Sequence, residues 1–85
     1  MTNAKKTALL ALMEYASPIL DERTVGKTYI AKEAHGHLYQ RATYKQIWVK
    51  YNWITDCVID DHDEGIDFTF TVTQQLVDDI AFFQL

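Results

Sequence analysis

The last 35 residues of this 85-residue chain contain no lysine or arginine. The same segment carries eight Asp and Glu, whereas residues 23–50 carry six basic residues and one acidic residue. Folded domains usually intersperse the two signs, so this separation is a physical indication about partners. The middle segment favours an anionic partner, and the C-terminal segment would repel one.

Cysteine and long apolar runs are also scarce. Cys57 is the single cysteine, which excludes an intramolecular disulfide and fits a reducing cytosol. No run reaches the roughly 18 apolar residues that a membrane span needs, so we expect a cytoplasmic protein with no membrane partner. The apolar content of 48 % and eleven aromatic residues instead predict a folded single domain over residues 1–85. Its core is small, so a homodimer that adds buried area is kept as an alternative.

Apolar periodicity predicts an α+β chain with the element order α-α-α-β-β-α. The expected helices span residues 4–16, 28–35, 40–51 and 74–84, and the expected two-stranded antiparallel hairpin pairs residues 53–60 with 66–73. The third helix is the ambiguous element. Tyr44, Ile47, Trp48 and Tyr51 share a helical face, but residues 47–53 also alternate as in a strand. Helix is favoured for residues 44–51, and strand stays open.

The element order and one spacing resemble a winged helix-turn-helix domain. Ile30-Ala31 stand in the second expected helix, as in the generic pattern of that fold. Asn52-Trp53-Ile54 follow 22–24 residues after Ile30, where the family closes its recognition helix with a Gly-Leu-Ile-like tripeptide. Asn52 is a sensible substitute for glycine because asparagine tolerates the left-handed conformation at a helix end.

This resemblance implies a DNA-binding transcriptional regulator that inserts its third helix into the major groove of double-stranded DNA. On that helix, Lys45 and Gln46 would reach base edges. Phosphates would be neutralised by four other basic side chains of the middle segment, Lys27, Lys32, Arg41 and Lys50.

The expected wing carries the opposite charge. Its tip gathers five carboxylates, Asp60, Asp61, Asp63, Glu64 and Asp67. Carboxylates near phosphate add repulsion and forfeit counterion release. The alternative is therefore a non-enzymatic acidic interaction module that binds a basic protein partner through the wing and the last helix, in one form by mimicking nucleic acid.

Other chemistry is not expected. No nucleophile elbow, apolar carboxylate pair or activated cysteine is evident, so we predict neither an enzyme nor a cofactor. His35, His37, His62 and Cys57 show no established zinc spacing. A calcium loop that begins at Asp61 would place Ile66 and Val72 where glycine and glutamate are needed. The sequence therefore predicts no metal site.

Overall fold

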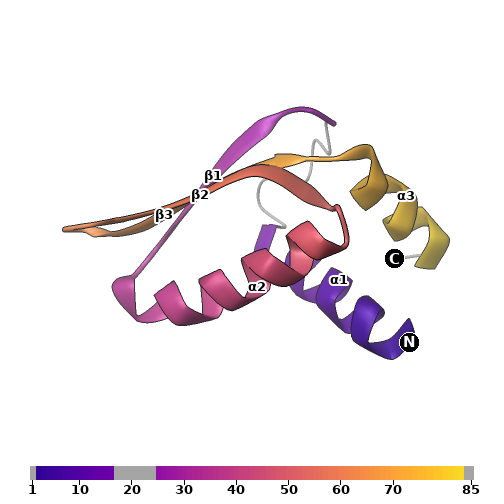
Figure 1. The fold of residues 1–85 in the computed structure, drawn as a ribbon, viewed down its shortest axis with the longest axis horizontal. Helices are drawn as coiled ribbons and strands as arrows, with labels where there is room; N and C mark the ends of the chain where they lie inside the picture. The colour runs from indigo at the N-terminus through magenta and orange to yellow at the C-terminus, as the bar shows by residue number, and fades with distance from the viewer. Residues whose placement is uncertain (1, 17–24, 84–85) are drawn as a thin grey trace.

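The structure of the protein, a computed structural model, describes residues 2–16 and 25–83. Within these ranges the chain has a small α+β fold with three α-helices and three strands. In chain order the elements are α1 (Thr2–Ala16), β1 (Thr28–Glu33), the short 3-10 helix η1 (His35–His37), α2 (Leu38–Lys50), β2 (Ile54–His62), β3 (Gly65–Val72) and α3 (Gln74–Phe83). The strands form one antiparallel sheet in the order β1-β3-β2 (Figure 1).

The predicted order of three helices before a two-stranded hairpin is wrong. Residues 28–35, expected as a helix, contain β1, which pairs with β3 and makes the sheet three-stranded. The side chains alternate across the sheet: Tyr29 is buried against Phe70, with ring centroids 5.9 Å apart, whereas Ile30 is 56 % exposed. A helix would have turned Ile30 inward, but Thr, Tyr and Ile favour a strand once a partner strand is available.

The remaining predicted elements are confirmed with small shifts at their ends. The residues left open between helix and strand belong to α2, where Trp48 is fully buried. Leu9 and Leu12 form the buried stripe of α1, as the periodicity predicts. Residue 84, the expected end of the last helix, lies outside the described residues. No helix of the described ranges is long and apolar enough to cross a membrane.

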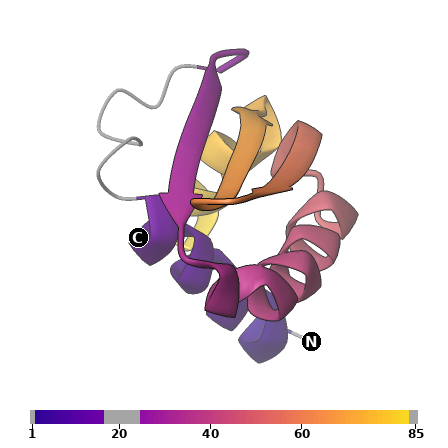
Figure 2. The same ribbon diagram turned by 90° about the vertical axis from the view of Figure 1, so that its left-hand side faces the viewer.

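Helices α1 and α2 pack on one face of the sheet (Figures 1 and 2). The largest fully buried side chains between these layers are Trp48, Trp53, Phe68, Phe70, Leu9 and Leu12. The indole Nε1 of Trp48 donates to the carbonyl of Ala8 at 3.0 Å, which joins the two helices inside this core. On the opposite face of the sheet, Ile30 and Val58 remain more than half exposed.

Asn52 ends α2 and directs the chain into the hairpin. It adopts φ 62°, so the expected left-handed conformation is confirmed. The amide of Trp53 then donates to the carbonyl of Trp48 at 3.0 Å, the hydrogen bond that closes a helix end of this kind. Thr73 caps α3, because its Oγ1 accepts a hydrogen bond from the amide of Leu76 at 3.2 Å. The same hydroxyl donates to the carbonyl of Asn52 at 2.6 Å, so one side chain links the start of α3 to the end of α2.

Asp79 on α3 is a buried carboxylate with three polar neighbours. Its oxygens accept from the indole of Trp53 at 2.6 Å and from the amide of Gln75 at 2.9 Å, and Lys5 lies 3.4 Å away. Burial opposes the charge of Asp79, but these hydrogen bonds and Lys5 hold the pKa of the carboxyl below its usual range. Asp79 therefore fastens α3 to the core and to α1.

Replacing Asp79 by alanine is expected to lower the free energy of unfolding by about 1–3 kcal/mol, since the buried indole of Trp53 loses its acceptor. Urea denaturation of wild type and variant measures this difference. Because the pKa of Asp79 is lower in the folded state, its contribution is complete above the unfolded pKa and is lost as pH falls through the folded one. The difference between the two proteins should therefore shrink in acid, while the exposed control Asp78→Ala shows little effect at any pH. A difference that stays constant with pH would contradict the assignment.

Candidate interaction site at the acidic end of the hairpin

The carboxylates that the sequence analysis places at the wing lie together at the end of the β2–β3 hairpin. This end projects away from α3, at the opposite extreme of the molecule (Figure 1). Four of the side chains are exposed and the fifth, that of Asp67, is 24 % exposed. The members of this acidic end are Asp60, Asp61, Asp63, Glu64 and Asp67. Hairpin pairing thus confirms that they are neighbours, although what they bind stays a prediction.

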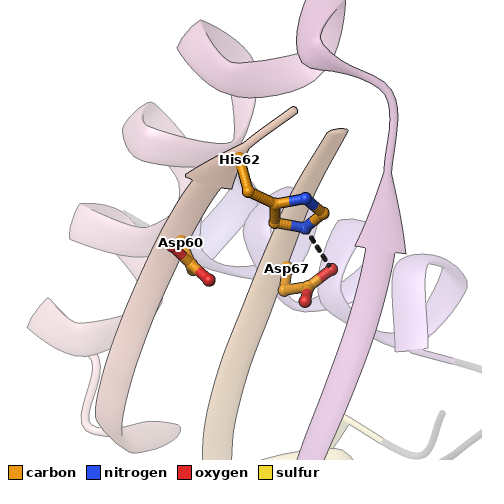
Figure 3. Close-up of side chains that lie close together, drawn as sticks. All are labelled: Asp60, His62 and Asp67. Atoms are coloured by element: carbon orange, nitrogen blue, oxygen red, sulfur yellow. Dashed lines mark ion pairs between the residues drawn. The ribbon is translucent and has the colours of Figure 1, made fainter. Parts of the chain in front are cut away.

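Asp67 is partly neutralised by two side chains from neighbouring strands. Lys32 of β1 pairs with its Oδ2 at 3.3 Å, and the Nε2 of His62 lies 3.1 Å from its Oδ1 (Figure 3). The close contact with His62 lowers the pKa of Asp67, and the same contact raises the pKa of the His62 imidazole. Asp67 is therefore a less available anion than its four exposed neighbours.

His35, in the short helix η1, contacts the end of the hairpin. Its Nε2 lies 3.4 Å from the carboxylate of Asp61 and is hydrogen-bonded to the backbone carbonyl of His62. Both neighbours of this nitrogen are acceptors, so Nε2 carries a proton. The sequence analysis considered His35 only as a possible zinc ligand and so did not anticipate this contact. The contact depends on how η1 meets the hairpin, which no local pattern shows.

Arg41, predicted to contact phosphate, is instead a core residue. Its guanidinium makes two hydrogen bonds to Glu33, at 2.8 and 3.0 Å, and lies 3.6 Å from the ring centre of Tyr15. These hydrogen bonds lower the pKa of Glu33, and the Tyr15 hydroxyl donates to the same carboxylate at 3.1 Å. With 5 % of its surface exposed, Arg41 offers little to a nucleic acid.

The other predicted DNA contacts do not gather on one basic face. Gln46 and Lys50 are exposed on α2, and Lys45 is half-buried on the same helix. Lys27 directly precedes β1, and Lys32 on β1 is paired with Asp67. The helix therefore presents Gln46 and Lys50 most freely, without the arginine that was expected to flank them.

Cys57 does not provide a reactive thiol. It is half-buried against the core beside a bulge in β2, and burial raises the pKa of its thiol although Lys45 lies close enough to oppose the shift. A raised pKa leaves little thiolate at neutral pH, so the residue is a poor nucleophile. Its position fits a structural role.

Comparisons of the chain with family models, with curated proteins and with solved structures find no match. The function is therefore inferred from the geometry and charge of the chain itself.

Replacing Arg41 by methionine should lower the free energy of unfolding by about 3 kcal/mol, because the largely buried carboxylate of Glu33 would keep its charge without its partner. Chemical denaturation is the measurement. Lys50→Met is the matched control on the same helix and should change stability by less than about 0.5 kcal/mol. Equal, small effects in both variants would show that Arg41 is not the core residue described above.

Proposed function

We propose that this protein is a non-enzymatic interaction module whose acidic end binds a basic surface of a partner protein. The observation that carries the proposal is the concentration of five carboxylates at one extreme of the fold, four of them exposed. Their fields add over short distances, and such an arrangement attracts a positively charged partner and accelerates its association.

Part of the positive charge that would oppose this role is paired with carboxylates. Arg41 is paired with Glu33 inside the core, Lys32 is paired with Asp67, and Lys5 is paired with Asp79. The sequence analysis also expected the last helix to contact the partner. Of the two carboxylates of α3, Asp79 is buried and Asp78 is exposed, so this helix offers a single carboxylate. The hairpin end is therefore the stronger candidate for contact.

A winged-helix DNA-binding domain is the second candidate. Its support is that α2 leads through Asn52 into the β2–β3 hairpin and presents Gln46 and Lys50 to solvent. A phosphate-binding surface is weakened by the burial of Arg41 and by the carboxylates of the hairpin, which repel DNA. For these reasons we rank the basic protein partner first.

The proposal is tested by charge neutralisation at the exposed tip, in the triple variant Asp61→Asn, Asp63→Asn, Glu64→Gln. Binding to a fluorescent peptide rich in lysine and arginine is measured by anisotropy over a salt series. We expect the triple variant to bind at least about tenfold more weakly, which corresponds to about 1.4 kcal/mol. The matched control neutralises three exposed carboxylates away from the tip, in the variant Glu14→Gln, Asp56→Asn, Asp78→Asn, and should bind nearly as well as wild type.

Equal losses in the two triple variants would mean that net charge alone drives binding, which contradicts a defined site. The second candidate is tested in parallel with a mixed-sequence DNA duplex at low salt. Duplex binding by the wild type that is lost in Lys45→Ala, Lys50→Ala would favour the winged-helix role over the acidic module.

A further inference from the structure

Three side chains with metal-binding atoms converge on the outer face of the hairpin. Asp60 and His62 of β2 and Asp67 of β3 each offer one donor atom, and these atoms all lie within 4.8 Å of one another (Figure 3). The strand register explains the convergence. Asp60 and Asp67 are direct partners across the two strands, and His62 lies two residues along the same face. Opposite His62 stands Gly65, which has no side chain, so the imidazole has room to lean toward Asp67.

The imidazole nitrogen that faces the carboxylates is ion-paired with Asp67 but not aligned for a hydrogen bond. The Nε2 of His62 has almost no solvent-exposed surface and makes no contact with hydrogen-bond geometry, although Asp67 Oδ1 is 3.1 Å away. On the other side of the ring, Nδ1 lies 3.3 Å from the amide of Glu64, which holds the ring in place. A hollow of about 110 Å³ adjoins the site and is lined in part by His62, Asp67 and Glu33. A nitrogen with a carboxylate beside it but no aligned hydrogen bond, next to a polar hollow, has room to exchange that contact for a bound ion.

We propose that Asp60, His62 and Asp67 bind a divalent transition-metal ion, with zinc as the best fit. One imidazole with two carboxylates is a donor set that zinc accepts, whereas magnesium and calcium prefer oxygen ligands alone. Ligand bonds of about 2.0–2.2 Å place tetrahedral donors about 3.4 Å apart, so small side-chain rotations from the present geometry suffice. The ion also relieves repulsion between Asp60 and Asp67, since like charges directly opposite across two strands destabilise a sheet.

Two interactions change when the ion binds. The Nε2 of His62 loses its proton, and the neutral ring then carries its proton on Nδ1, so the long hydrogen bond from Glu64 is released. Lys32 competes with the ion, because its ammonium group lies 3.3 Å from Asp67 Oδ2. Three protein ligands leave a fourth position for water or for a donor from a partner. The site uses Asp60 and Asp67 of the acidic end, but none of the tip carboxylates Asp61, Asp63 and Glu64 that the charge-neutralised triple variant removes.

The proposal is tested by isothermal titration of the chelator-treated protein with zinc chloride, with magnesium chloride as the comparison ion. We expect one zinc ion per chain and no measurable magnesium binding. His62→Gln and Asp67→Asn should each weaken zinc binding at least tenfold, and Lys32→Met should tighten it severalfold because a competing cation is removed. The matched controls His37→Gln and Asp63→Asn should bind zinc as the wild type does.

A second measurement keeps the test decisive if a variant folds poorly. In the wild-type protein, histidine ring NMR spectra should show His62 changing to the Nδ1-protonated form on zinc addition, while His37 is unaffected. Absence of zinc binding, zinc binding retained in His62→Gln, or a response confined to His35 and His37 would each overturn the proposal. The triple variant of the exposed tip should still bind zinc, so failure of the proposed function and failure of the metal site are distinguishable.

Discussion

The pairing of Arg41 with Glu33 is the interaction on which the arrangement of this fold depends. It joins β1 to α2 by two hydrogen bonds, and the guanidinium packs on Tyr15 of α1, so three elements meet at one buried ion pair. The end of β1 also lies close against Gly65 of β3. A side chain at Gly65 would overlap the backbone carbonyl of Glu33, so the two backbones can approach this closely only with glycine there. Because the edge strand β1 is fixed in this way, Lys32, which precedes Glu33, stays opposite Asp67 of β3. The pairing of Lys32 with Asp67 on the hairpin therefore depends on the contact between Arg41 and Glu33.

The sequence predicted elements whose periodicity is long and clear, and it failed where pairing decides the structure. The fifteen residues of α1 and the alternation of β3 carry their own signal. The six residues of β1 do not, because Ile30 and Ala31 suit a helix face as well as a strand. What selects the strand is the register opposite β3, in which Tyr29 reaches Phe70 and the hydroxyl of Thr28 meets that of Thr71 at 3.0 Å. A partner 43 positions away in sequence is invisible to local periodicity.

The same limit applies to the candidate site. Sequence placed the carboxylates at the hairpin correctly, since their positions follow from the turn alone. It could not say which basic side chains remain available, because that depends on tertiary pairing. The sequence analysis assigned Arg41 to phosphate. In the structure its planar guanidinium instead stacks against the rings of Tyr15 and Trp48, a favourable environment that an exposed position would not provide. The pattern Asp60-x-His62 was the one local signal for the metal-binding face, since alternate residues of a strand share a face.

Strand alternation also explains how one short hairpin can hold two separable groups of carboxylates. Asp60, His62 and Asp67 share the outer face of the sheet, whereas Asp61 points to the other face and meets His35 of η1. Asp63 and Glu64 belong to the turn itself and are exposed. A cation bound between Asp60 and Asp67 would therefore leave the charges of Asp63 and Glu64 free for a partner, while it reduces the negative field that the partner meets. The two roles share Asp60, Asp67 and an electrostatic field, but the tip carboxylates Asp61, Asp63 and Glu64 are not metal ligands, so mutations can separate the two roles.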